Sequence, residues 1–187
     1  GLVRTQGSFF AFPTAMTTAV ADMVEYARES FTPGRPLRSA VEDLCHRIHA
    51  DFTYEGGVTG IDTPLLEVWE KQRGVCQDFA HLALAMLRSL GLVAAYVSGY
   101  ILTRPPEGQE RLVGADASHA WFGVMDQNGE WLFLDPTNDQ WVRGEHILVA
   151  VGRDYGDVPP LKGICYGGGS VNPEVAVSVE YLGDEDA

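Results

Sequence analysis

Hydrophobic positions follow a helical period in the first half of the chain and alternate as they do in strands in the second half. Apolar residues at helical spacing predict helices over 14–30, 37–52, 63–69 and 76–90. The last of these is apolar on nearly all sides, which is typical of a buried helix. Runs rich in β-branched and aromatic residues predict strands over 94–102, 118–126, 130–135 and 171–182. The apolar run 146–151 fits neither period clearly.

The order of these elements predicts an α+β fold, because the helices come first and antiparallel strands follow. The chain has 187 residues, of which 45% are hydrophobic, and it shows no repeats and no internal linker. We therefore expect a single domain over 1–187. The chain begins with Gly1, shows no secretory leader, and has no apolar run near the ~18 residues that a membrane helix needs. These features predict a cytoplasmic protein without a membrane partner.

The charge balance argues against a polyanionic partner. Lys and Arg number 13 against 26 Asp and Glu, a net charge of −13 at pH 7. Such a surface repels phosphate backbones and anionic lipids, so we expect no nucleic-acid partner. The three cysteines, Cys45, Cys76 and Cys165, form no CxxC pair, so they indicate neither a disulfide framework nor a zinc site, and we expect no cofactor. The oligomeric state is left open.

Cys76 is the first candidate for chemistry, because it follows Gly74-Val75 and begins the long apolar helix. Unpaired N–H groups and a partial positive charge at a helix N-terminus stabilise a thiolate and can also hold an oxyanion. A lone cysteine is more often a small buried hydrophobe. The position alone therefore leaves both interpretations open.

A histidine is the usual base for a cysteine nucleophile. His119 lies in an otherwise apolar and aromatic strand, where a histidine is more often a structural residue. His81 lies five residues after Cys76 on the same helix, which rotates its side chain well away from the thiol. We therefore reject His81 and keep His119 as the candidate base.

Asp135 ends an apolar strand just before Pro136 and could orient a histidine, although turn aspartates of this kind often bind backbone N–H groups. Hairpin register decides whether it meets His119. A two-residue turn at Asn128-Gly129 would turn Asp135 away from His119. A type I turn followed by Gly129 at positive φ pairs Asp126 with Glu130 and makes Asp135 a diagonal neighbour of His119. Asp and Gly at the turn ends favour this second turn.

Four ordered motifs resemble the transglutaminase-like superfamily, in the bacterial branch often described as candidate cysteine proteases. They are GVCQDFAHL (74–82), VSGY (97–100), ASHAWFGV (117–124) and LDPTND (134–139). GRDYGDVPPLKG (152–163) also looks like that branch, and the resemblance covers roughly 52–182. It implies a papain-like transglutaminase core, with N-terminal helices and the nucleophile helix packed on an antiparallel sheet. Many relatives carry a β-rich domain ahead of this core, so the chain is also expected to be a fragment.

The resemblance implies a catalytic triad of Cys76, His119 and Asp135. Cys76 would attack an amide of a peptide or protein and form a thioester, with hydrolysis favoured over transfer to an amine. Tyr54 and Trp121 are expected to line the substrate site. A non-catalytic module that keeps the fold is the alternative, which the intact triad disfavours.

A metal-binding function is the remaining alternative. Cys45, His46 and His49 lie on one predicted helix, and the i,i+4 pair could converge on an ion. No third ligand is apparent, and "DQNGE" is too short for an EF-hand loop. We therefore predict no metal site.

Overall fold

The computed structural model describes residues 9–102, 118–160, 163, 166–167 and 176–180. Its helices are α2 (Ala21–Ser30), α3 (Leu37–Asp51), α4 (Leu65–Lys71) and α5 (Cys76–Ser89). A five-stranded antiparallel sheet has the strand order β6-β5-β4-β3-β7. Its strands are β3 (Ala94–Ile101), β4 (Ser118–Met125), β5 (Trp131–Asp135), β6 (Gln140–Trp141) and β7 (His146–Gly152). Two short parallel strands, β1 (Thr53–Tyr54) and β2 (Arg73–Gly74), lie apart from it. The predicted α+β fold is confirmed.

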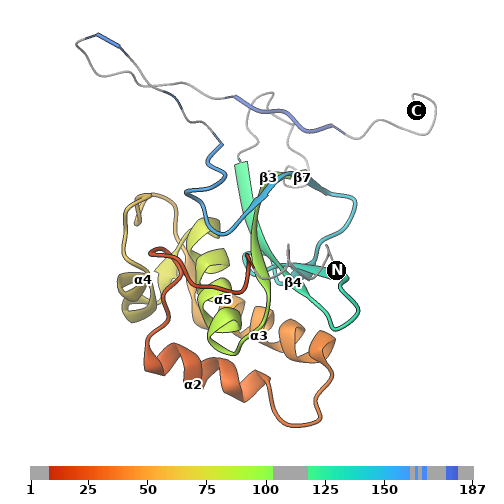
Figure 1. Ribbon diagram of the computed structural model, residues 1–187. Helices are drawn as coiled ribbons and strands as arrows, with labels where there is room; N and C mark the ends of the chain where they lie inside the picture. Colours follow the sequence, from red (N-terminus) through yellow and green to blue (C-terminus); the bar gives the residue numbers. More distant parts are fainter. Residues whose placement is uncertain (1–8, 103–117, 161–162, 164–165, 168–175, 181–187) are drawn as a thin grey trace, which may run out of the picture.

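The central helix α5 contacts β3 and β4 on the sheet and also α2, α3 and α4 (Figure 1). All its side chains from Asp78 to Arg88 are buried, which confirms the burial predicted from its apolar pattern. The hydrophobic core forms where α5 meets the sheet, through residues such as Phe79, Leu82, Tyr96 and Phe122. α5 ends before Gly91, whose φ of 81° lies in the left-handed region that glycine tolerates.

Two predicted helix starts were wrong. The first helix begins at Ala21 and not at Thr14, because Thr14 and Thr17 form a turn. In this turn the Thr17 N–H donates to Thr14 O (3.1 Å), and the Thr14 N–H donates to Thr17 Oγ1 (3.0 Å). In α4 the N-cap is Pro64 and not Thr63, whose hydroxyl accepts instead from the Gly60 N–H (2.8 Å). In both cases threonine hydroxyls satisfy loop N–H groups and not a helix end.

The sheet confirms the predicted strands over 94–102, 118–126 and 130–135, and assigns the ambiguous run 146–151 to β7. The predicted strand over 171–182 lies mostly outside the described residues. Within 176–180, Val177 is an isolated bridge residue and Val179 is buried.

The hairpin between β4 and β5 has the predicted register. Met125 lies opposite Trp131 and Phe122 opposite Leu134. The Asp126 N–H donates to Glu130 O (2.8 Å), the Gly129 N–H donates to Asp126 O (3.1 Å), and Gly129 has φ 87°. This is a type I turn with a glycine bulge, so the two-residue turn is excluded. Asp126 Oδ1 also accepts the Glu130 N–H (2.8 Å).

We expect Gly129→Val to lower the free energy of unfolding by roughly 1–2 kcal/mol, because a β-branched residue is strained at positive φ. Urea unfolding would measure the loss. Gly144→Val is the matched control, since Gly144 lies in an exposed turn with open space around it and an ordinary φ. Equal stability of the two variants would contradict the strained-bulge account.

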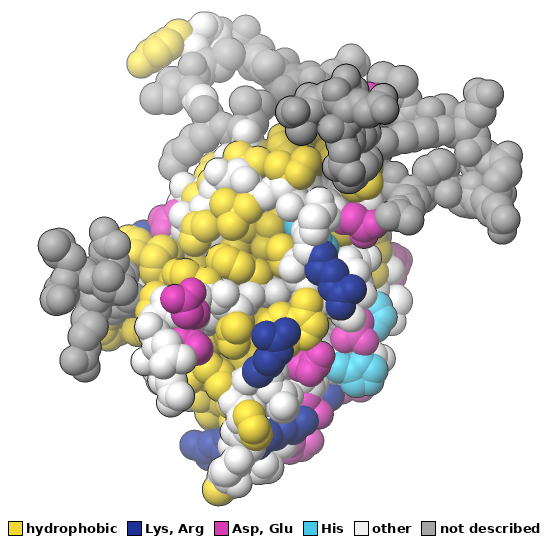
Figure 2. All heavy atoms as spheres, turned by 90° about the vertical axis from the view of Figure 1, so that its right-hand side faces the viewer, with side chains coloured by type: hydrophobic (Ala, Val, Ile, Leu, Met, Phe, Trp, Pro, Cys, Tyr) yellow, Lys and Arg dark blue, Asp and Glu magenta, His cyan; other side chains and the backbone are white. Residues whose placement is uncertain are grey.

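The edge strand β7 exposes apolar side chains: Ile147, Leu148, Val149 and Val151. Figure 2 shows a broad hydrophobic area on one face of the molecule, with acidic and basic side chains intermixed beside it. None of the helices among the described residues has the length and hydropathy needed to cross a membrane.

Candidate active site

Cys76 is the first residue of α5 and is partly exposed. The chain reaches it through β2, which pairs with β1 so that Tyr54 lies opposite Gly74. Two N–H groups at the helix start are satisfied locally, Val75 N–H by Asp78 Oδ2 (2.8 Å) and Asp78 N–H by Val75 O (2.9 Å). The N–H of Cys76 has no acceptor within the helix. It is therefore left without an intrahelical partner and could donate to an oxyanion formed at the thiol.

Asp78 holds this helix start in place. Its Oδ2 accepts from Val75 N–H and from the Thr59 hydroxyl (2.6 Å), and it is 3% exposed. Burial raises the pKa of Asp78, against the effect of these two hydrogen bonds. The carboxylate thus joins the loop before α4 to the turn that carries Cys76.

We expect Asp78→Ala to lower the free energy of unfolding by roughly 1–3 kcal/mol, because it removes a helix cap and leaves two partly buried donors unpaired. The substitution should also slow alkylation of Cys76 at pH 6, since the start of α5 loses the hydrogen bond between Val75 N–H and Asp78. Urea unfolding and peptide mapping measure the two effects. Thr59→Val is the matched control, because it keeps the cap on Val75. A stable Asp78→Ala protein with a parental alkylation rate would contradict this role.

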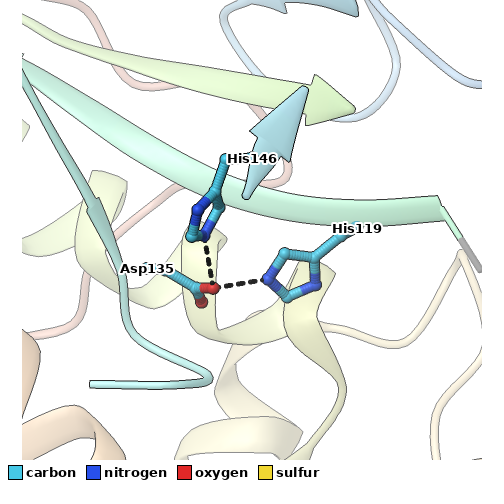
Figure 3. Close-up of side chains that lie close together, drawn as sticks. All are labelled: His119, Asp135 and His146. Atoms are coloured by element: carbon cyan, nitrogen blue, oxygen red, sulfur yellow. Dashed lines mark hydrogen bonds and ion pairs between the residues drawn. The ribbon is translucent and has the colours of Figure 1, made fainter. Parts of the chain in front are cut away.

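His119 and Asp135 meet as the hairpin register requires (Figure 3). His119 Nε2 lies 2.7 Å from Asp135 Oδ2, and their side chains are 8% and 0% exposed. His119 also interacts with the Cys76 side chain. Because Nε2 faces the aspartate, Nδ1 is the ring nitrogen left for the thiol. The structure thus places His119 of β4 and Asp135 of β5 in direct contact, and Cys76 of α5 close enough to act on His119.

The environment of His119 favours its charged form. Burial by itself lowers the pKa of His119, but hydrogen bonds with Asp135 and Cys76 and their negative charges outweigh it and raise the pKa to about 9. At neutral pH His119 is therefore an imidazolium. A cation beside Cys76 stabilises a thiolate.

Asp135 is surrounded by donors. Its Oδ1 accepts the N–H groups of Thr137 (2.9 Å) and Asn138 (3.3 Å), and its Oδ2 accepts from Asn138 Nδ2 (2.7 Å) in addition to His119. Burial raises the pKa of Asp135, but these hydrogen bonds and the charge of His119 overcome it and hold the pKa well below its ordinary value. Asp135 thus binds the N–H groups of its own turn and His119 at the same time, the two interactions that were alternatives in the sequence.

His146, the first residue of β7, was missed by sequence reasoning. Its Nε2 lies 3.1 Å from the same Asp135 Oδ2, and its side chain is 1% exposed (Figure 3). The one available signal was a histidine at the start of an apolar run. That run has no clear period, so its pattern did not indicate on which face of the sheet the His146 side chain would lie.

The two predicted substrate-binding residues differ in position. Tyr54 is 56% exposed, and its ring packs against that of Phe79 in a T-shaped arrangement. Partial burial raises the pKa of Tyr54, and the nearby Cys76 raises it further. Its contact with a substrate stays a prediction. Trp121 is fully buried and packs against the rings of His119 and His146. In this structure it supports the two histidines and offers no surface to a substrate.

His81 is excluded as a base, as predicted. It is buried, its Nε2 accepts the Tyr155 N–H (3.1 Å), and burial lowers its pKa to about 4.

Cys45, His46 and His49 do not converge. Cys45 is buried, His46 Nδ1 lies 2.7 Å from Asp139 Oδ2, and His49 Nδ1 lies 3.0 Å from Thr137 O. Both histidines thus bind the turn after β5.

Within the described part of the chain, His119, Asp135 and His146 form the one cluster of ligand-type side chains close enough to surround a metal ion. Each facing atom already has a hydrogen-bonding partner, at 2.7 Å and 3.1 Å. The hydrogen-bonded network accounts for the cluster, and we assign no metal to it.

A helix that begins with a cysteine and packs on an antiparallel sheet carrying a histidine and an aspartate is the arrangement of papain-like α+β folds. A family model, the transglutaminase-like superfamily, matches residues 20–136. This is more than half of the chain, and the chain belongs to that superfamily.

Relatives by sequence include an uncharacterized protein of Mycobacterium tuberculosis, 50% identical over 186 residues. An uncharacterized protein of Mycobacterium leprae is 39% identical over 176 residues. The alignments cover 97% and 91% of this chain but only 58% and 60% of those proteins. The chain therefore spans somewhat over half the length of these relatives.

Among solved structures, a candidate cysteine protease from Cytophaga hutchinsonii aligns with a TM-score of 0.66 and 26% identity, over 80% of this chain and 48% of that one. The periplasmic domain of TgpA from Pseudomonas aeruginosa aligns with a TM-score of 0.51 and 22% identity, over 74% and 48%. The second likeness concerns the fold alone.

Proposed function

We propose that this chain is a thiol-dependent hydrolase of amide bonds in peptides or proteins. The observation that carries the proposal is the pair of His119 Nε2 and Asp135 Oδ2 at 2.7 Å, with Cys76 acting on the same histidine from the start of a buried helix. The likeness to a candidate cysteine protease supports the same reaction class.

The thiolate of Cys76 attacks the amide carbonyl, and the new oxyanion accepts the Cys76 N–H at the start of α5. His119 gives its proton to the leaving amine as the C–N bond breaks, which leaves a thioester on Cys76. Neutral His119 then takes a proton from water, and the resulting hydroxide attacks the thioester. The acid leaves, and the Cys76 thiolate and the His119 imidazolium are restored. Asp135 keeps His119 oriented through both steps.

Isotope labelling tests this proposal without a known substrate. A complex peptide mixture is incubated with the protein in H₂¹⁸O and then analysed by mass spectrometry. Hydrolysis through Cys76 puts one ¹⁸O into each new carboxylate, at a new C-terminus or at a deamidated side chain. Cys76→Ala should give no labelled products, whereas Cys45→Ala, which removes a buried thiol of α3, should still give them.

The same experiment with a primary amine added separates hydrolysis from transamidation. Amine adducts formed in place of ¹⁸O-labelled acids would replace the proposed hydrolysis with transfer to an amine. Labelled products that persist in Cys76→Ala would contradict the thiol mechanism altogether.

A further inference from the structure

Two histidines share one carboxylate oxygen at this site. Asp135 Oδ2 lies 2.7 Å from His119 Nε2 and 3.1 Å from His146 Nε2 (Figure 3). The two histidine rings are tilted with centroids 6.2 Å apart, and the His146 and Trp121 rings pack in a T-shaped arrangement with centroids 5.2 Å apart. The mechanism above uses His119 and leaves His146 without a role.

A β-bulge puts His146 on the same face as His119. Near one end of the β3–β7 pair, Tyr96 lies opposite Gly152, and continuing that register would place His146 opposite Leu102. The register shifts between Ser98 and Gly99, so that His146 lies opposite Ile101 instead. Ile101 shares a face with Gly99, the partner of His119. Without the bulge, His146 would point to the other face of the sheet.

Gly99 makes this bulge possible. A Cβ at Gly99 would collide with the Ile147 carbonyl oxygen and would lie 2.6 Å from Trp121 Cη2. The backbone of β7 therefore approaches β3 more closely here than any other residue would allow. This close approach accompanies the position of His146, the first residue of β7, beside Asp135.

The hydrogen bonds of His146 define its tautomer. Its Nδ1 faces the Arg143 N–H at 3.5 Å, which makes Nδ1 the acceptor. The proton of a neutral ring then lies on Nε2 and points at Asp135 Oδ2. His146 is thus a donor to the carboxylate that His119 also uses.

We propose that His146 is a positioning residue, a neutral imidazole whose Nε2–H shares Asp135 with His119 and limits how strongly the carboxylate stabilises the His119 imidazolium. A carboxylate that gives part of its hydrogen-bonding capacity to a second donor is a weaker base toward the first. The His119 imidazolium can then release its Nδ1 proton to the leaving amine more readily. This inference rests on the proposed function, because it assigns His119 the acid role.

Other titratable groups lie around this network in the described part of the chain. Cys76 on α5 acts on His119, and Asp135 acts on Cys45 of α3, together with Asp139 and Glu42. Burial and nearby carboxylates raise the pKa of Cys45, which stays a neutral thiol. Asp139 is paired with His46 at 2.7 Å.

The test is a titration of His119 by NMR of ¹⁵N-histidine-labelled protein in the presence of EDTA. His119 is assigned from the signal lost in His119→Gln. In the parent the midpoint should lie near pH 9, the raised pKa of His119. His146→Phe keeps a ring against Trp121 but removes the donor, and should move the midpoint up by about one pH unit. His146→Gln restores an N–H and should return it toward the parent.

A packing role alone would leave the midpoint unchanged in His146→Phe. An unchanged or lowered midpoint in that folded variant therefore overturns the proposal. A second measurement needs no substitution: in the parent at pH 8, the ¹⁵N shifts should show His146 protonated on Nε2, and protonation on Nδ1 would also overturn it. Alkylation of Cys76 at pH 6 is recorded on the same samples. If Cys76 of the parent is unreactive, the proposed function fails independently of the His146 result.

Discussion

Asp135→Asn should lower the turnover of an amide substrate by on the order of 10³ or more, while the protein still folds. An asparagine NH₂ facing His119 donates to Nε2 and moves the ring proton to Nδ1, the nitrogen that must exchange a proton with Cys76. If the asparagine side chain is flipped, its NH₂ faces the N–H groups of Thr137 and Asn138. In the parent protein both of these N–H groups donate to Asp135 Oδ1. Either arrangement leaves buried donors unpaired, so stability should also fall by roughly 1–3 kcal/mol.

Steady-state kinetics on a peptide found in the ¹⁸O experiment would measure the loss of turnover, with urea unfolding to confirm the fold. Asp139→Asn is the matched control, since Asp139 lies in the same turn but binds His46 at 2.7 Å, at an exposed position of α3. Turnover of Asp135→Asn within a few fold of the parent would mean that Asp135 is only a turn residue.

Gly99→Ala should be the most destabilising single-methyl change in the sheet. The added Cβ meets a backbone oxygen of β7 and the fully buried Trp121, and neither is the free end of a flexible side chain. We expect the free energy of unfolding to fall by about 3 kcal/mol, at the upper end of overpacking costs. If the strands separate to relieve the clash, His146 also leaves Asp135.

Urea unfolding would measure this loss, and the NMR titration would report the position of His146. Gly144→Ala is the control, because a Cβ there meets nothing within 4 Å. A Gly99→Ala protein as stable as that control would show that the bulge is not constrained in the way described.

Local residues were sufficient to predict the hairpin that joins His119 to Asp135. Asp126 and Gly129 select a type I turn with a bulge, and that turn alone fixes which side chains share a face across eight residues of strand. The start of α5 at Cys76 was also predicted correctly, because a continuous apolar run at helical spacing begins there.

The position of His146 could not be predicted in this way. Residues 146–151 lack a clear period because β7 carries the bulge at Val149, which interrupts the alternation along the strand. The bulge depends on a close approach to Gly99, nearly 50 residues earlier in the chain. A glycine in a strand suggests a bulge, but it does not say which neighbouring strand is shifted.

The starts of α2 and α4 were wrong for a related reason. Thr14 and Thr63 have the side chains of helix caps, but in the structure the Thr14 hydroxyl accepts from the Met16 N–H and the Thr63 hydroxyl accepts from the Gly60 N–H. The competition between a cap and a turn depends on how the surrounding loop packs.

Selective alkylation tests the central claim, an activated Cys76, most directly. The protein is treated briefly with iodoacetamide at pH 6 and the three cysteines are quantified by peptide mapping. Cys76 should be labelled well ahead of Cys45 and Cys165, because the His119 imidazolium and the N-terminus of α5 stabilise its thiolate. His119→Gln should remove this preference. Labelling of Cys45 or Cys165 before Cys76, or a Cys76 that reacts at pH 6 no faster than a free thiol, would contradict the account.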